Sequence, residues 1–146
     1  PQTILTLQGD PQRGQVLFRS SELKCLNCHR HNGQGNDLGP ELTHIGRQRT
    51  RTELLTSLLE PSREIDPRYA VYLVRTADER QLTGLLVQRN SQVLVLRDAD
   101  NKEHRLRSQE VVSVTPSRLS LMPDGLLANL TPQQAADLLE FLVQSR

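Results

Sequence analysis

CLNCHR, residues 25–30, holds both cysteines of this 146-residue chain. Two residues separate Cys25 from Cys28, and His29 follows the second thiol directly. One helical turn can therefore present both sulfurs on one side, with the imidazole just beyond them. A disulfide between these two cysteines would close only a very short loop and add little stability. The two thiols and the imidazole therefore need a common explanation.

Three chemistries use this spacing. The first is covalent c-type haem attachment, in which the thiols form thioethers and the adjacent imidazole binds the iron. The second is a thioredoxin-like redox pair, which expects a strand before the motif and a helix after it. The third is a zinc site, which would have to recruit two of His29, His31, His44 and His104 without a second cysteine pair. The flanking sequence favours haem, because a helical pattern precedes the motif and a loop pattern follows it.

Both ends of the chain predict amphipathic helices. Asp10 can cap a helix whose first turn holds Pro11, with Gly14, Leu17 and Phe18 on one face. Near the other end, Thr131 to Gln134 form a capping box with Pro at the first helical position. A stripe of apolar residues follows: Ala135, Leu138, Leu139 and Leu142. We expect the two helices to cross, with Gly14 permitting a close approach.

The order of these segments resembles a class I cytochrome c, and more narrowly the haem-binding domain of planctomycete and verrucomicrobial proteins. The resemblance rests on GDPQRGQVLF, CLNCH, GNDLGPELTHIGRQ, a helical TELLTSLLEPSREI (52–65) and the closing SLMPDGLLANLTPQQAADLLEFL. It implies one covalently bound haem c per chain and single-electron transfer without substrate chemistry. The implied fold is a mainly α cytochrome c fold with an inserted small antiparallel β-sheet or SH3-like barrel, α+β overall.

The resemblance also implies site residues. Met122, the only methionine, lies in SLMPDG, where class I cytochromes place the second axial ligand. His44 is the rival ligand. Pro40, in a Gly-Pro pair, would offer its carbonyl to the imidazole of His29. Arg47, Arg49 and Arg51 are candidates to pair with the haem propionates, and Arg47 and Arg51 are the two that we expect to bind the cofactor. His31 and His104 are expected to be solvated.

Residues 67–116 differ in texture from the rest of the chain. Short runs rich in Val, Leu and Tyr alternate with turn-like segments, which predicts a five-stranded antiparallel meander. We expect this β insertion to interrupt a haem domain formed by residues 1–66 and 117–146. Removing the insertion leaves 43 positions between His29 and Met122, as in compact relatives. Its place before the Met122 loop suggests that it affects how firmly the thioether is held.

Composition limits the partners. Eighteen Lys and Arg face seventeen Asp and Glu, which gives no electrostatic case for nucleic acid. No apolar run is long enough for membrane insertion. Redox proteins are the expected partners, and a longer dehydrogenase-type chain is one setting for such a domain. Haem attachment implies a periplasmic or otherwise exported location. Two alternatives stay open: a haem enzyme or small-gas sensor with a displaceable distal ligand, and a docking module in which haem is structural.

Overall fold

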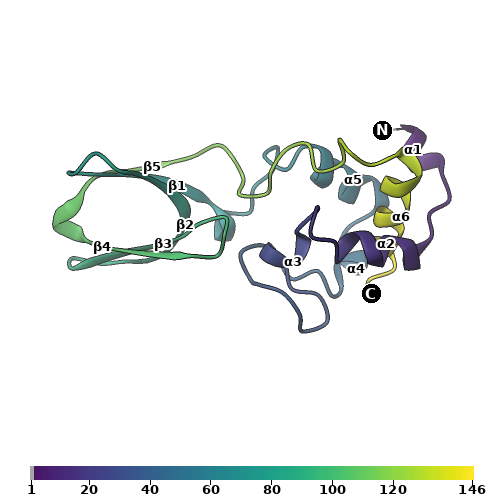
Figure 1. Ribbon diagram of the computed structural model, residues 1–146, viewed down its shortest axis with the longest axis horizontal. Coiled ribbons are helices and arrows are strands. Elements are labelled where there is room, and N and C mark those ends of the chain that lie inside the picture. Colours follow the sequence, from purple (N-terminus) through teal and green to yellow (C-terminus); the bar gives the residue numbers. More distant parts are fainter. Residues whose placement is uncertain (1) are drawn as a thin grey trace.

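The computed structural model describes residues 2–146 and has an α+β fold. Helices gather at one end of an elongated molecule and an antiparallel sheet forms the other (Figure 1). The helices are α1 (Gln2–Thr6), α2 (Pro11–Phe18), α3 (Cys25–Cys28), α4 (Ile45–Gln48), α5 (Arg51–Leu59) and α6 (Pro132–Val143). The strands are β1 (Val71–Thr76), β2 (Gln81–Arg89), β3 (Val93–Arg97), β4 (Glu103–Arg107) and β5 (Val111–Pro116), with 3₁₀ turns η1 (Pro67–Tyr69) and η2 (Ser108–Glu110).

Helix α2 begins and packs as its sequence predicts. The Asp10 carboxylate accepts hydrogen bonds from the backbone N–H groups of Gln12 at 2.8 Å and Arg13 at 3.1 Å. This contact satisfies donors that have no partner inside the helix. A Cβ at Gly14 would stand 2.0 Å from the carbonyl oxygen of Asp137, so only glycine fits where α2 crosses α6.

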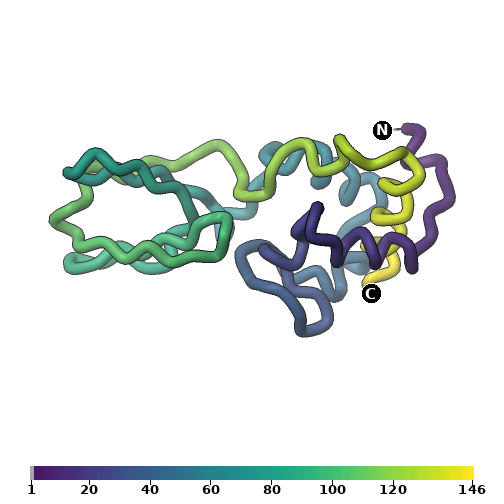
Figure 2. Tube along the Cα trace, viewed as in Figure 1, coloured from purple at the N-terminus to yellow at the C-terminus, as the bar shows by residue number. Residues whose placement is uncertain are grey.

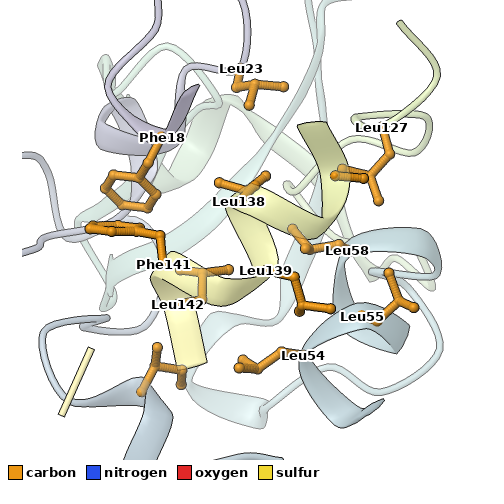
Figure 3. Close-up of a cluster of buried hydrophobic side chains, with 12 residues drawn as sticks. Phe18, Leu23, Leu54, Leu55, Leu58, Leu127, Leu138, Leu139, Phe141 and Leu142 are labelled. Atoms are coloured by element: carbon orange, nitrogen blue, oxygen red, sulfur yellow. The ribbon is translucent and has the colours of Figure 1, made fainter. Parts of the chain in front are cut away.

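Helix α6 is the centre of the helical core. Thr131 and Gln134 form the predicted capping box at its start. Figure 3 shows its leucines and Phe141 facing α2 on one side and α5 on the other. The helical core comprises Phe18, Leu23, Ile45, Leu54, Leu55, Leu58, Leu127, Ala135, Leu138, Leu139, Phe141 and Leu142. The crossing of the first and last amphipathic helices is therefore confirmed.

Helix α5 is shorter than predicted. Thr50 and Glu53 form a capping box at its start, but the helix ends at Leu59 rather than continuing to residue 65. Pro61 explains the difference, because a proline disfavours helical backbone in the residue before it and cannot donate to the helix.

The strands all lie within residues 67–116, the range predicted for the β insertion. Their order in the sheet is β4-β3-β2-β1-β5, and every pairing is antiparallel. All five strands contribute side chains to one apolar cluster, the sheet core, so the sheet curls around it. The sheet core comprises Val74, Leu94, Leu96 and Leu106, with Leu82, Leu86, Val111 and Val114 against them.

The predicted meander holds for β1 to β4 but is wrong for β5. Strand β5 pairs with β1 instead of β4. The 3₁₀ turn η2 carries the chain from β4 to the opposite edge of the curled sheet, which lets Val111 and Val114 join the sheet core. The trace in Figure 2 follows this crossing at the end of the molecule farthest from the helices.

The sheet packs against the segment that follows α3. Leu38, Val71 and Leu85 are buried together, with Cys28, Tyr69 and Leu121 against them. We call this set the interface cluster. It joins the insertion to the cysteine motif and to the loop before α6. In residues 2–146, none of the helices has the length and apolar character needed to cross a bilayer.

Candidate functional site

Helix α3 carries the two thiols one turn apart. It spans Cys25–Cys28, and both cysteines are free and partly buried. Cys25 packs against the helical core, whereas Cys28 packs against the interface cluster. Burial raises the pKa of Cys25 to about 11, and burial also raises the pKa of Cys28. Reactive redox thiols need a lowered pKa. The surroundings of Cys25 and Cys28 instead favour the uncharged thiols over thiolates.

His29 follows α3 and is held by one ring nitrogen. Its Nδ1 lies 2.7 Å from the carbonyl oxygen of Pro40. A carbonyl oxygen can only accept, so Nδ1 carries the proton and the Nε2 of the neutral ring keeps a lone pair. Burial lowers the pKa of His29, partly offset by the bond to Pro40. The ring is thus prepared to bind a metal through Nε2, with its tautomer fixed by the carbonyl.

Gly39 lies directly against this imidazole. A Cβ at Gly39 would stand 2.6 Å from Cε1 and 2.9 Å from Nδ1 of His29, closer than any ordinary contact. The Gly39 N–H also donates to the carbonyl oxygen of Cys28 at 2.6 Å. The Gly-Pro pair therefore does two things: the glycine lets the backbone reach the ring, and Pro40 orients the ring.

His31 is buried, and the prediction that it is solvated is wrong. Its side chain is 6% exposed, and its ring lies between Phe18 and Phe141, with centroid distances of 5.4 and 4.9 Å. The Ser145 hydroxyl donates to the carbonyl of Phe141 at 2.8 Å, so it accepts from the His31 Nε2 3.0 Å away. His31 thus has no Nε2 lone pair free for a metal. The residues next to His31 in the sequence carry no signal for this burial, because Phe18 and Phe141 come together only where α2 crosses α6.

The remaining histidines have other environments. His104 is partly exposed, and its Nε2 lies 2.7 Å from a carboxylate oxygen of Asp98. The expectation that His104 is simply solvated is therefore only partly met. His44 is exposed at the start of α4. A buried metal would find no prepared ligand in either. Of the four histidines, only His29 combines partial burial with an available Nε2.

Met122 lies in the irregular segment between β5 and α6. It is partly buried and packs against the helical core, as Cys25 does. Its neighbour Leu121 packs against the interface cluster, as Cys28 does. The Met122 N–H donates to the Ser120 hydroxyl at 3.1 Å, and the Ser120 N–H donates to the Ser62 hydroxyl at 3.0 Å. The loop that holds Met122 thus contacts both the helical core, against which Cys25 packs, and the interface cluster, against which Cys28 packs. A hydrogen bond also joins it to Ser62, just after α5.

The arginines predicted near the propionates differ in their partners. Arg51 forms an ion pair with Glu140 at 2.6 Å and donates to the Leu7 carbonyl at 3.1 Å. Its guanidinium therefore fastens α5 to α6, a role that sequence reasoning missed and that competes with a propionate role. Arg47 and Arg49 are exposed on and after α4. A propionate-pairing role for Arg47 stays a prediction.

The arrangement fits a haem c better than the competing cofactors. No group of three or more His, Cys, Asp and Glu side chains is gathered for a metal ion within residues 2–146, so a zinc cage has no support there. Both thiols are free, lie one helical turn apart and have apolar surroundings. The adjacent imidazole has its Nδ1 bonded to Pro40 and its Nε2 available. Covalent c-type haem attachment uses two such thiols and an imidazole with one free ring nitrogen.

Comparison with known proteins adds no family. No protein-family model matches this chain, and none of the curated proteins compared with it matches either. Its function is therefore inferred from its own residues and contacts.

Proposed function

We propose that this chain is a c-type cytochrome domain that carries single electrons through one covalently attached haem c. Cys25 and Cys28 would hold the haem through thioethers, and His29 and Met122 would bind the iron. The haem supplies the redox chemistry when bound. The chain would bind the haem, and the Pro40 carbonyl would orient the imidazole of His29. The observation that carries the proposal is the His29 ring, whose Nδ1 bond to Pro40 leaves Nε2 free and which directly follows two free cysteines in the chain.

The proposed fold is a class I cytochrome c fold interrupted by the β insertion. Three features support it: the crossing of α2 and α6, the cysteine motif after α2 and the methionine loop before α6. With residues 67–116 set aside, the helical elements follow one another in the order expected from the resemblance. A barrel of the SH3-like type is proposed for the insertion, supported by the curled five-stranded sheet.

Electron transfer is favoured over catalysis by the residues near Met122. A haem enzyme or gas sensor needs an open distal position or a distal acid–base group. The nearest acid along the chain, Asp124, is exposed and lies in a turn. Redox proteins are the proposed partners, and an exported compartment is the proposed location, because thioether formation uses reduced thiols and haem outside the cytoplasm.

The test is to produce the chain in a bacterial periplasm with a cytochrome c maturation system. We expect red protein whose haem stays with the polypeptide on a denaturing gel and after acid-acetone extraction. The double variant Cys25→Ser/Cys28→Ser should lose the covalent haem, while His44→Ala should keep it. Extraction of all pigment from the parent protein, or an intact mass equal to bare polypeptide, would refute the proposal.

A further inference from the structure

Three side chains form a row across the outer face of the sheet. Val71 of β1 is paired with Leu85 of β2, and Leu85 is paired with Arg97 of β3. Directly opposed residues of antiparallel strands place their side chains on the same face. Val71 and Leu85 are 2% and 9% exposed, and both belong to the interface cluster. The row therefore faces the helical part of the molecule, with a cation at one end.

This row holds the segment that follows the cysteine motif. Leu38, 2% exposed, packs with Val71 and Leu85. Arg97 forms an ion pair with Asp37 at 2.8 Å, and the Asn101 side chain accepts from the Arg97 Nε at 3.1 Å. The Arg97 side chain is 19% exposed, against 70% for Asp37. Arg97 also lowers the pKa of Asp37, which favours the ionised carboxylate that the ion pair needs.

The far end of the same segment holds the imidazole. We call residues 37–40 the clamp loop. Asp37 and Leu38 attach it to the sheet, whereas Gly39 lies against the His29 ring and Pro40 accepts the bond from Nδ1 at 2.7 Å. Four consecutive residues thus join the sheet to the ring. Only Leu38 and Gly39 lie between Asp37 and Pro40, so the contact with Arg97 and the contact with the imidazole belong to one short segment.

We propose that Arg97 is a positioning residue for His29: it holds Asp37 against the sheet, and the clamp loop thereby holds the Pro40 carbonyl on the imidazole. The β insertion then acts on the ligand rather than standing apart from it. The consequence for the iron rests on the function proposed above, whereas the mechanical link between the sheet and the ring does not.

The first test measures the link without reference to haem. Hydrogen exchange of the Gly39 amide, which donates to Cys28, reports opening of the clamp loop in the protein as purified, whether or not haem is attached. We expect Arg97→Ala and Asp37→Asn each to speed this exchange roughly two- to five-fold, the range for a partly exposed ion pair. The double variant should exchange no faster than either single variant. Arg97→Lys should restore most of the protection.

Arg80→Ala is the matched control. Arg80 directly precedes β2 and has two ion-pair partners outside the clamp loop: Asp78 at 2.9 Å in the β1–β2 turn and Glu110 at 3.5 Å in η2. Its removal should leave exchange at Gly39 unchanged. Equal exchange in the parent and Arg97→Ala would overturn the inference, even in a protein that binds haem. Equal acceleration by Arg80→Ala would also overturn it, because the effect would then be general loosening.

The second test measures the ligand. A bond from Nδ1 to a carbonyl raises the basicity of the imidazole and favours the ferric state. Loosening the clamp loop should therefore shift the midpoint potential of the haem protein upward in Arg97→Ala, with rescue by Arg97→Lys and no shift in Arg80→Ala. Faster exchange with an unmoved potential would overturn the positioning role. If the matured protein carries no covalent haem, the proposed function is refuted. If Arg97→Ala still speeds exchange at Gly39 in that protein, the link between the sheet and the ring is supported all the same.

Discussion

The Asp137 carboxylate offers a test of the fold that is independent of any cofactor. It is 2% exposed on α6 and accepts from the Asp10 N–H at 2.8 Å, from Arg13 at 2.8 and 3.1 Å and from Gln133 at 3.0 Å. Chiefly because of the bond from Arg13, its pKa falls from 3.8 to about 2. We predict that Asp137→Asn destabilises the protein, because one of the donors then meets an amide N–H₂ instead of an oxygen.

The pKa shift sets the size of this loss. A depression from 3.8 to about 2 corresponds to about 2 kcal/mol of stabilisation of the charged form. Because the folded-state pKa is lowered, the stabilisation is complete above the unfolded-state pKa near 4 and is lost as the pH falls through about 2. Since Arg13 is 60% exposed, solvent screening makes this figure an upper value.

Urea unfolding followed by circular dichroism measures the effect. At pH 7 the variant should unfold with a free energy lower by about 1–2 kcal/mol. The gap should narrow steadily between pH 4 and pH 2.5, because in this range the Asp137 carboxylate takes up a proton in the unfolded parent protein while it stays largely ionised in the folded one. Glu60→Gln is the matched control: this carboxylate pairs with Arg63 at 3.0 Å on the surface, so its loss should cost less than about 0.5 kcal/mol. A gap that stays constant or widens in acid would refute the reasoning.

Two further predictions concern the candidate site. Gly39→Ala should displace the His29 ring, because the added Cβ would stand 2.6 Å from Cε1. We expect less covalent haem per chain on a denaturing gel stained for haem. A haem content equal to that of the parent protein would contradict the close packing of Gly39 against the ring. Met122→Ala should abolish the weak far-red absorption band typical of methionine-bound ferric haem, and it should let the ferrous form bind carbon monoxide rapidly. If the band persists in the visible spectrum of the variant, another residue is the ligand.

Local rules predicted the helix starts and the strand positions. Asp10 and Thr131 cap α2 and α6 because their short polar side chains reach the free N–H groups of the first turn, which depends only on neighbours in sequence. The five strands likewise follow from alternating β-branched and turn residues. The predicted end of α5 at residue 65 is wrong, although Pro61 marks an earlier end in the sequence because a proline disfavours helical backbone in the residue before it.

Long-range contacts were not predictable in the same way. The burial of His31 depends on two phenylalanines that meet only when α2 crosses α6. The ion pair of Arg51 with Glu140 likewise needs α5 and α6 side by side. His31, Arg51 and Glu140 are polar, and the residues next to them in the sequence do not indicate burial. Only the three-dimensional arrangement supplies the partners that make their burial favourable.

The β insertion is separable in topology yet coupled in energy. Its two ends lie together, because Tyr72 pairs with Pro116 and the Ser117 N–H donates to the Val71 carbonyl at 2.8 Å. A chain could therefore acquire or lose the sheet without moving the helices. Its outer face, however, buries Leu38 and packs against Cys28. Deleting the sheet would expose this apolar surface beside the second thiol, so a deletion cannot separate a fold defect from an effect on the ligand. Single substitutions along the row that ends at Arg97 leave the sheet in place and can therefore separate these two effects.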